Sequence, residues 1–371
     1  MPALNDIRVL VAAGGTGGHL TPALAVADEL TARGALVSFV TTPSQLARVA
    51  ERFPAYALEM RGFERRLLAR QNAVTLWRLA AAAPRSWGIV SAVRPQVAVG
   101  GGGYLSGPVV AAAALRRVPA LAIESDAHLG VTNRLLAALV PRVCLSFPIE
   151  GREPPRFVLT GRPLSVAQLD ADAATGRAAF GLSDAQPVVL VFGGSQGAQS
   201  LNRACLAAFG AGPLELQVLH VCGPRHFDEM TAALAACDAD LERYRLLPYT
   251  DDLPHAMAAA DLVVGRAGGS VAEIAALGRP AILVPYPFAT ADHQSTNAAF
   301  MAAAGAAVVV ADADLDGTLL ARTVRELLAD TTRLARMAAA SRAAGRPDAT
   351  QRVADQVETL LAGRIQARSR A

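Results

Sequence analysis

Four glycine-rich segments contain the residue types that can bind a phosphate group. Each follows a short apolar run, and they are Gly14–His19, Gly100–Gly107, Gly193–Gly197 and Arg266–Ser270. Glycine lets backbone N–H groups approach an anion without a Cβ in the way, and a helix that starts next adds unpaired donors and the positive end of its dipole. The first loop is neither G-x-G-x-x-G nor the G-x-x-x-x-G-K-[ST] of a P-loop, which disfavours the two commonest nucleotide sites. The segments therefore predict anion sites of another kind.

Two nearby side chains have the chemistry to move a proton beside such an anion. His19 ends the first glycine loop, where a helix N-terminus favours the neutral imidazole as a base or as a hydrogen-bond partner of an acceptor diphosphate. A structural cap of the loop is the alternative. Glu124 follows the strand-like run Ala120–Ile123, so we expect it at the carboxyl edge of a sheet, although a surface carboxylate beside a helix has the same pattern.

Metal-dependent chemistry through a D-x-D motif is the main alternative. Three pairs match it formally, namely Asp170 with Asp172, Asp238 with Asp240, and Asp312 with Asp314. Each lies in an Ala/Asp-rich connection without a glycine loop, which favours surface loops over a metal site. The cysteines have neither C-x-x-C nor His-linked spacing and are interpreted as reduced residues of a cytoplasmic protein; they are Cys144, Cys205, Cys222 and Cys237. We predict no metal and no cofactor.

The elements that must position these loops alternate between strand and helix. Strand-like runs are expected at Ile7–Ala13, Leu36–Thr41, Val97–Gly100, Ala120–Ile123, Val143–Ser146, Phe157–Leu159, Val188–Phe192, Leu216–Cys222, Tyr244–Leu247, Leu262–Gly265, Ala281–Pro285 and Ala307–Val310. Alternation of this kind predicts an α/β fold with parallel sheets and right-handed crossovers. The segment VAVGGGGYLSGPVVAAAALRRVPALAI resembles LVVGRAGGSVAEIAALGRPAILVP in the second half. The sequence therefore predicts two Rossmann-like domains.

The 371 residues fit two domains that face each other across a cleft. We expect an N-terminal domain over 1–163 and a C-terminal domain over 164–345. A helix near 348–361 has the composition to pack on either domain. Ligands of such folds lie outside the carboxyl ends of the strands, so the cleft is the predicted site.

Composition excludes several classes of protein. The 35 basic side chains are all arginine, which rules out a lysine Schiff base and a P-loop lysine, and the net charge of +3 is too small to indicate nucleic-acid binding. No signal-peptide pattern opens the chain, and no apolar run is long enough to span a bilayer. Arginines mixed with leucine, phenylalanine and tryptophan over Arg61–Trp87 predict either an interfacial patch on an anionic membrane or an amphipathic helix with a solvated basic face.

The motifs together resemble the MurG family, glycosyltransferase family 28 with the two-domain GT-B fold. The resemblance rests on Val9–Leu20 and on the segments GGGGYLSGP, FGGSQGAQSLN, GRAGGSVAEI, VPYPFA and DHQSTNA, in this order. It implies an inverting transferase that uses UDP-N-acetylglucosamine (UDP-GlcNAc) and lipid I, undecaprenyl-pyrophosphoryl-N-acetylmuramoyl-peptide, to make the β-1,4-linked disaccharide of lipid II. It also implies that the N-terminal domain binds the acceptor and the membrane and that the C-terminal domain binds the nucleotide sugar. The enzyme is then expected to be peripheral at the cytoplasmic face of the cell membrane, with cell-wall synthesis proteins as partners and a place in cell shape and division.

The resemblance assigns roles to individual residues. Ser195, Gln196 and Gly197 match the donor-diphosphate loop, and Glu273 matches a ribose carboxylate. Gln294 matches a residue that reads the sugar hydroxyls, and Thr250 falls where a backbone group contacts uracil; a polar cap at a helix start is the alternative for both. The donor-binding residues are Thr16, Gly17, Gly18, Asp126, Arg162, Ser165, Ser195, Gln196, Gly197, Thr250, Gly268, Gly269, Ser270, Glu273 and Gln294. The catalytic residues are His19 and Glu124, and the acceptor-binding residues are Gly102, Gly103, Tyr104 and His128.

Two segments depart from the family pattern. Ile123-Glu124-Ser125-Asp126 stands where His-Glu-Gln-Asn is usual, so a carboxylate replaces an amide at Asp126, and His128 is the candidate to replace the histidine. Ser165 occupies the position of a donor-phosphate arginine, and we expect Arg162, three residues earlier, to restore that charge.

Other functions share parts of this pattern. A dinucleotide-dependent oxidoreductase also uses strand–glycine–helix units, but G-x-G-x-x-G and an acid after the second strand are missing. A UDP-sugar epimerase, a diacylglycerol glycosyltransferase and a non-catalytic nucleotide-sugar-binding partner remain alternatives.

Overall fold

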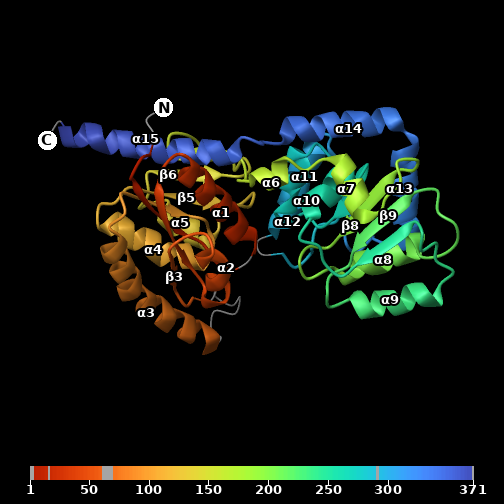
Figure 1. The fold of residues 1–371 in the computed structure, drawn as a ribbon, viewed down its shortest axis with the longest axis horizontal. Coiled ribbons are helices and arrows are strands. Elements are labelled where there is room, and N and C mark those ends of the chain that lie inside the picture. The colour runs from red at the N-terminus through yellow and green to blue at the C-terminus, as the bar shows by residue number, and fades with distance from the viewer. Residues whose placement is uncertain (1–3, 16, 61–69, 290–291, 370–371) are drawn as a thin grey trace. The chain divides into compact units, whose positions relative to one another are not determined.

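The computed structural model of the chain describes residues 4–15, 17–60, 70–289 and 292–369. Backbone contacts divide it into two compact units, each built on one sheet of parallel strands (Figure 1). The N-terminal unit comprises Met1–Ser165 and Pro347–Ala371, and the C-terminal unit comprises Val166–Arg346. The predicted α/β class with two Rossmann-like domains is confirmed.

The N-terminal unit contains a seven-stranded sheet in the order β3-β2-β1-β4-β5-β6-β7, and every neighbouring pair is parallel. Its strands are β1 (Arg8–Ala12), β2 (Leu36–Thr41), β3 (Ala55–Ala57), β4 (Val97–Gly100), β5 (Ala120–Glu124), β6 (Arg142–Leu145) and β7 (Phe157–Leu159). Its helices are α1 (Gly17–Ala32), η1 (Pro43–Gln45), α2 (Leu46–Ala50), α3 (Arg70–Val93), α4 (Gly103–Leu115), α5 (Val131–Leu136) and α15 (Ala349–Ser369).

Alternate residues of the central strand β1 enter two separate layers of core. Val9 and Val11 pack with residues of α1 and α15, whereas Leu10 and Ala12 pack with residues of α3 and α4. All four side chains are fully buried. A parallel strand covered by helices on both faces needs apolar residues at consecutive positions, which explains the uninterrupted run that marks β1 in the sequence.

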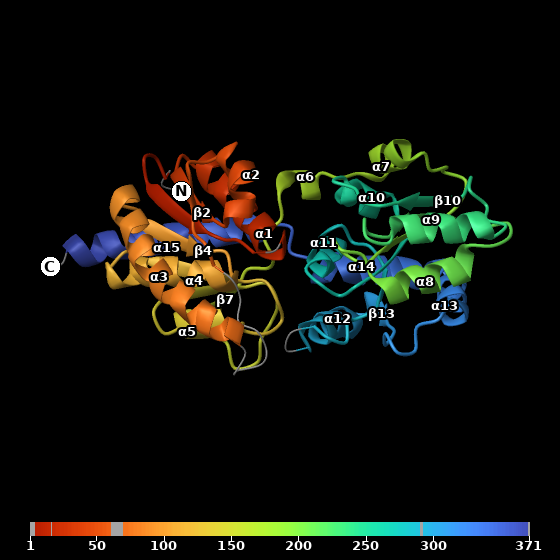
Figure 2. The same cartoon turned by 90° about the horizontal axis from the view of Figure 1, so that it is seen from below.

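Helix α15 returns to the N-terminal unit and lies along α1 (Figures 1 and 2). Val353, Ala354 and Val357 are fully buried in the core layer that also holds Val9. At the edge of this contact, the guanidinium of Arg33 lies 2.6 Å from Asp355 and 2.8 Å from Glu358. Apolar burial and ion pairs therefore both hold α15 on this unit.

The C-terminal unit contains a six-stranded parallel sheet in the order β10-β9-β8-β11-β12-β13. Its strands are β8 (Val188–Phe192), β9 (Gln217–Val221), β10 (Tyr244–Leu247), β11 (Leu262–Gly265), β12 (Ala281–Leu283) and β13 (Ala307–Val309). Its helices are α6 (Val166–Leu169), α7 (Ala173–Phe180), α8 (Gln199–Phe209), α9 (Phe227–Ala236), α10 (Leu253–Ala259), α11 (Ser270–Ala276), α12 (His293–Ala303), α13 (Gly317–Ala329) and α14 (Thr331–Ala344).

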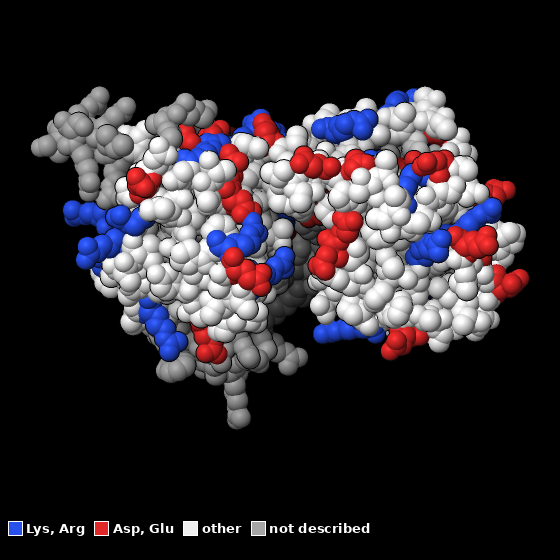
Figure 3. All heavy atoms as spheres, in the orientation of Figure 1, with Lys and Arg blue, Asp and Glu red and all other residues white. Residues whose placement is uncertain are grey.

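Helices α8 and α13 lie side by side and cover one face of this sheet (Figure 2). Val189 and Val191 of β8 pack there with Leu201 of α8 and Val324 of α13. On the face drawn in Figure 3, arginine and carboxylate side chains are interspersed over each unit, in keeping with the small net charge.

The structure adds one strand that the sequence did not predict. The three-residue strand β3 lies at the edge of the N-terminal sheet, and its side chains are exposed or half-buried. An edge strand this short needs no apolar run, so the sequence carries no period-2 signal there. Within the described residues, none of the helices has the length and hydropathy needed to cross a bilayer.

Candidate functional site

Two glycine loops of the N-terminal unit meet at one edge of its sheet. Strands β1 and β4 are parallel neighbours, so the loops that follow them both emerge at their carboxyl ends. The amide of Gly101 donates to the carbonyl of Ala12 over 2.9 Å, which joins the two loops directly. Parallel pairing therefore brings together two motifs that lie more than 80 residues apart in the sequence.

His19 packs against the second of these loops. It lies in the first turn of α1, half-buried, and a Cβ placed on Gly102 would come 2.8 Å from its Nδ1. Gly102 and Gly103 have positive φ angles of 93° and 74°, and a Cβ on Gly103 would lie 3.1 Å from the carbonyl oxygen of Gly14. Glycine is thus needed here both for the backbone conformation and for the approach of the imidazole.

The other predicted residues of these loops are placed as follows. Gly17 and Gly18 are exposed at the start of α1, while Thr16 lies outside the described residues. Tyr104 is exposed in the first turn of α4. The exposed backbone of the α1 start is therefore accessible to a ligand.

The carboxylate of Glu124 is buried and bonded to its own loop. Its Oε1 accepts hydrogen bonds from the amides of Ser125 at 2.9 Å and Asp126 at 3.2 Å. Its Oε2 accepts from the amide of Gly130 at 2.9 Å and from Nδ2 of Asn133 at 3.0 Å. Burial raises the pKa of the Glu124 carboxyl, and these hydrogen bonds oppose that rise. Glu124 therefore organises the loop, and its predicted catalytic role stays a prediction.

Asn133 is a site residue that the sequence analysis missed. Besides Glu124, its Nδ2 also contacts the carbonyl of Ile123 at 2.9 Å, and the residue is buried in α5. The segment VTNRLL carried no clear signal for this role, because Asn133 stands between the polar Thr132 and Arg134 and its burial is known only from the structure.

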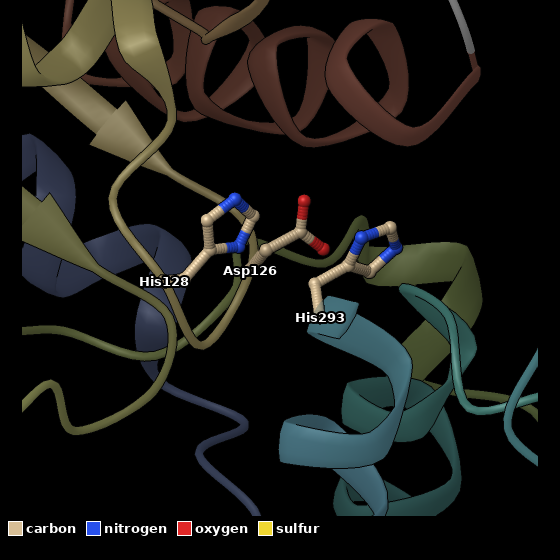
Figure 4. Close-up of side chains that lie close together, drawn as sticks. All are labelled: Asp126, His128 and His293. Atoms are coloured by element: carbon tan, nitrogen blue, oxygen red, sulfur yellow. The ribbon is translucent and has the colours of Figure 1, made fainter. Parts of the chain in front are cut away.

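The loop between Ser125 and Gly130 carries both Asp126 and His128, and both are half-buried (Figure 4). Figure 4 also labels His293, the first residue of α12 in the C-terminal unit. The four hydrogen bonds to Glu124 hold the backbone of this loop, so they also fix the backbone positions of Asp126 and His128.

Arg162 follows β7 and is 6% exposed. Its guanidinium donates to the carbonyl of Gly18 at 2.6 Å and to the carbonyl of Ser125 at 3.3 Å. It thus links the first turn of α1 to the loop of Asp126. Ser165, the matched family position, is half-buried at the end of the unit. The predicted contact of Arg162 with a donor phosphate stays a prediction beside this observed tether.

Two glycine loops of the C-terminal unit also share one sheet edge. Strands β8 and β11 are parallel neighbours. After β8, the amide of Gly197 donates to the carbonyl of Gly194 at 2.9 Å, and this turn leaves Ser195 and Gln196 exposed ahead of α8. After β11, Gly268, Gly269 and Ser270 are half-buried at the start of α11, whose first turn holds the half-buried Glu273.

Arg266 holds the second loop in place. It is 8% exposed, lies 2.6 Å from the carboxylate of Asp312 and donates to the hydroxyl of Ser200 at 2.7 Å. Its guanidinium also donates to the carbonyl of Val284 at 3.2 Å. The sequence analysis quoted Arg266 only as part of a motif, because its partners lie on three other segments and give no local pattern.

The remaining donor candidates contact backbone near helix starts. The side-chain oxygen of Gln294 accepts from the amide of Tyr286 at 2.9 Å. The hydroxyl of Thr250 accepts from the amide of Asp252 at 3.0 Å, just before α10. Thr250 thus bonds the backbone just before α10, whereas Gln294 bonds a loop amide eight residues before it; the donor contacts of both residues stay predictions.

Each D-x-D pair has a carboxylate engaged in the fold. Asp172 accepts from the amide of Thr175 at 2.9 Å as the N-cap of α7. Asp240 accepts from the amide of Leu214 at 3.2 Å, and Asp312 pairs with Arg266. One aspartate of each pair thus has a structural role, as a helix cap, a backbone contact or an ion-pair partner.

Comparison with known proteins places these features in context. The family model for the glycosyltransferase family 28 N-terminal domain matches residues 9–145, and that for the C-terminal domain matches residues 188–353. A protein of Moorella thermoacetica called UDP-N-acetylglucosamine–N-acetylmuramyl-(pentapeptide) pyrophosphoryl-undecaprenol N-acetylglucosamine transferase is 40% identical over 361 residues, which is 94% of this chain and 97% of that protein. A protein of Halorhodospira halophila with the same name is 41% identical over 362 residues, covering 96% of this chain and 99% of its own.

Solved structures of similar fold include a MurG and an epimerase. The crystal structure of Acinetobacter baumannii MurG has a TM-score of 0.75 at 29% identity, covering 95% of this chain and 99% of its own. The UDP-GlcNAc 2-epimerase of Neisseria meningitidis, bound to UDP-GlcNAc, has a TM-score of 0.66 at 14% identity, covering 95% of this chain and 100% of its own. At that identity the epimerase shares the fold alone.

Proposed function

The chain belongs to the MurG family within glycosyltransferase family 28, and from this premise we propose that it moves N-acetylglucosamine from UDP-GlcNAc to the C4 hydroxyl of lipid I. The product is the β-1,4-linked disaccharide of lipid II. The single observation that carries this proposal beyond the shared family is the placement of two glycine loops at one sheet edge in each unit.

The C-terminal loops are the proposed donor site. The exposed turn of Ser195 and Gln196 precedes the eleven-residue helix α8, so its backbone amides and the helix dipole suit a diphosphate. The carboxylate of Glu273 suits two ribose hydroxyls, which are hydrogen-bond donors. Arg266 is buried and bonds Ser200 and Asp312, so it holds the loop after β11 in place without itself facing the proposed donor.

The N-terminal loops are the proposed acceptor site. In the reaction, the C4 oxygen of the acceptor forms a bond to the anomeric carbon of N-acetylglucosamine, and the bond from that carbon to UDP breaks with inversion. The hydroxyl proton passes to a base, and His19 is the candidate that the loops position. The negative charge that develops on UDP is stabilised by amides of the donor loop, which requires no metal ion.

Membrane association is part of the proposal, and a groove between α3, α4 and α5 supports it. The groove has a volume of about 360 Å³ and an almost wholly apolar lining. Its large exposed side chains are Trp87, Tyr104, Leu115, Val131, Leu135 and Leu139. The guanidinium of Arg116 lies over the ring of Trp87, 4.8 Å from its centroid, so a cation lies beside the apolar surface. An apolar face next to arginine suits an anionic lipid surface. Residues 61–69 of the predicted patch lie outside the described residues.

Turnover of defined substrates tests the proposed function. The full chain is incubated with radiolabelled UDP-GlcNAc and a short-chain lipid I analogue, and we expect a labelled β-1,4 disaccharide lipid. Glu273→Ala should lower kcat/KM for the donor about 10- to 100-fold, since an unpaired hydroxyl costs about 1–3 kcal/mol. Release of an epimerised UDP-sugar without transfer, or no turnover, would contradict the proposal.

The same assay with EDTA tests the role of a metal ion. We expect most of the activity to remain, because backbone amides supply the positive electrostatics in this site. Activity that EDTA abolishes and Mg²⁺ or Mn²⁺ restores would show that the leaving group needs a cation.

A further inference from the structure

A chain of buried polar groups in the C-terminal unit takes no part in the chemistry described so far. It joins α8, β9 and β10 through Cys205, Tyr244, His220 and Asn202, each at most 3% exposed. The Sγ of Cys205 lies 3.2 Å from Oη of Tyr244, which lies 2.8 Å from Nδ1 of His220. The Nε2 of His220 lies 3.0 Å from Oδ1 of Asn202, whose Nδ2 donates to the carbonyl of Cys222 at 2.9 Å.

The partners fix the direction of every hydrogen bond in this chain. Because Nδ2 of Asn202 faces a carbonyl, its Oδ1 faces His220, so Nε2 of His220 must carry a proton. Burial lowers the pKa of His220 to about 3, so the ring is neutral and its Nδ1 accepts from the hydroxyl of Tyr244. Burial raises the pKa of the Cys205 thiol to about 12, so that thiol stays protonated and donates to Tyr244. Donation therefore runs from Cys205 towards the carbonyl of Cys222.

The Cys222 end of this hydrogen-bonded network touches the predicted diphosphate loop. A Cβ on Gly197 would overlap the carbonyl oxygen of Cys222, and a Cβ on Gly223 would lie 2.5 Å from the backbone nitrogen of Gly197. The two backbone segments are thus in direct contact, with no side chain between them. A displacement of the Cys222 carbonyl must displace Gly197, because close-packed interiors transmit such shifts.

We propose that Tyr244 is a positioning residue for the loop Gly193–Gly197, acting through His220 and Asn202. This proposal rests on the proposed function, which assigns the donor diphosphate to that loop. The Tyr244 hydroxyl donates to Nδ1 of His220 and holds the ring in place, and the Nε2–H of that ring in turn holds the amide of Asn202. Without the hydroxyl the ring loses its Nδ1 partner and shifts, which weakens its bond to Asn202 and so the bond from Asn202 to the Cys222 carbonyl.

Tyr244→Phe is the direct test, because it keeps the ring and removes the hydroxyl. We expect the Kd for UDP and the KM for UDP-GlcNAc to rise about 3- to 10-fold, while kcat and the acceptor KM stay near wild type. The ¹⁵N chemical shift of Nδ1 of His220 should move towards that of an imidazole nitrogen without a hydrogen-bond donor, while Nε2 keeps its proton. Cys205→Ala is the matched control: it lies in the same core and leaves the Tyr244–His220–Asn202 links intact. There we expect the Kd for UDP to stay within about twofold of wild type.

A second variant covers the case in which Tyr244→Phe does not fold. Asn202→Leu keeps a side chain of similar volume but removes both the acceptor for Nε2–H of His220 and the donor to the Cys222 carbonyl, so it cuts the last two links. We expect a rise in the UDP Kd of at least the same size. A wild-type Kd in either folded variant would overturn the proposal, as would an unchanged ¹⁵N shift of Nδ1 of His220 in Tyr244→Phe.

Gly197→Ala separates this proposal from the assignment of the loop itself. Its Cβ would overlap the Cys222 carbonyl at a residue with a φ of 75°, so the loop must change shape. If wild type binds no UDP, or Gly197→Ala binds UDP as wild type does, the donor-loop assignment fails. If Gly197→Ala loses UDP and Tyr244→Phe retains it, only the positioning role fails.

Discussion

Two charged residues of the N-terminal unit, Glu124 and Arg162, hold backbone segments in place. Glu124 accepts from three amides of its own loop, and Arg162 donates to two carbonyls, one of them 144 residues away in the sequence. The sequence analysis predicted a catalytic role for Glu124 and expected Arg162 to replace the donor-phosphate arginine that the family has at the position of Ser165. Sequence alone does not reveal these tethers, because a carbonyl or an amide is present at every position and identifies no partner.

Arg162→Ala should lower the free energy of unfolding by about 2–4 kcal/mol. The carbonyl of the buried Ser125 and that of the exposed Gly18 would each lose a charged donor, and hydrogen bonds to charged groups contribute about 1.5–3 kcal/mol each. Urea unfolding measures the difference. The exposed Arg156 is the control, and Arg156→Ala should stay within about 0.5 kcal/mol of wild type. Equal losses in the two variants would show that the guanidinium of Arg162 is not a tether.

His220 makes stability depend on pH in a defined direction. Its pKa is about 3 in the folded chain and has its ordinary value of 6.5 when unfolded, so between these values only the unfolded state binds the proton. The stabilisation that the neutral His220 contributes to the folded state is therefore complete above pH 6.5 and is lost as the pH falls towards 3. Between pH 6 and 4, wild type should lose about 1.4 kcal/mol per pH unit relative to His220→Gln. Parallel pH profiles of the two proteins would refute the buried, neutral imidazole.

Among elements, strands with consecutive apolar residues were the most predictable. The run at Val188–Phe192 is found as β8 with identical bounds, because a strand buried on both faces must be apolar throughout. Strand β3 was missed because it lies at a sheet edge. The unit that α15 joins was left open, because its sequence shows which residues are apolar but not which surface receives them.

Helices α4 and α5 present the apolar groove, and substituting their exposed leucines tests its role. The double variant Leu115→Ser/Leu135→Ser should lower the partition coefficient on phosphatidylglycerol vesicles about tenfold or more, since each inserted leucine contributes about 1.5–3 kcal/mol. Co-sedimentation with vesicles measures binding. Leu36→Ser/Leu241→Ser replaces two similarly exposed leucines outside the groove and should bind as wild type does. A similar loss in both double variants would mean that the groove has no special role.

At the scale of the whole molecule, α15 closes the N-terminal unit by burying Val353, Ala354 and Val357 against the sheet. The contact is secured at its edge by Arg33, whose side chain is 18% exposed, with Glu358 at 12% and Asp355 at 40%. Partly buried networks of this kind contribute more than isolated surface pairs.

Arg33→Ala should therefore lower the free energy of unfolding by about 1–3 kcal/mol and speed amide exchange in α15. Hydrogen exchange followed by mass spectrometry resolves the helix. Arg52, whose pair with Asp28 is exposed on both sides, is the matched control, and Arg52→Ala should change stability by less than about 1 kcal/mol. Wild-type exchange in α15 of Arg33→Ala would show that apolar burial alone holds the helix.

The position of α15 in the chain has a consequence for folding during synthesis. The ribosome releases the whole C-terminal unit, Val166–Arg346, before it releases α15, which packs on α1 and β4. The unit synthesised first is thus completed last, and the part of its apolar core that α15 covers stays open while more than 180 further residues are added. An open apolar face on a nascent chain is an aggregation hazard and a binding surface for chaperones. Slow translation after Arg346 would prolong that exposure.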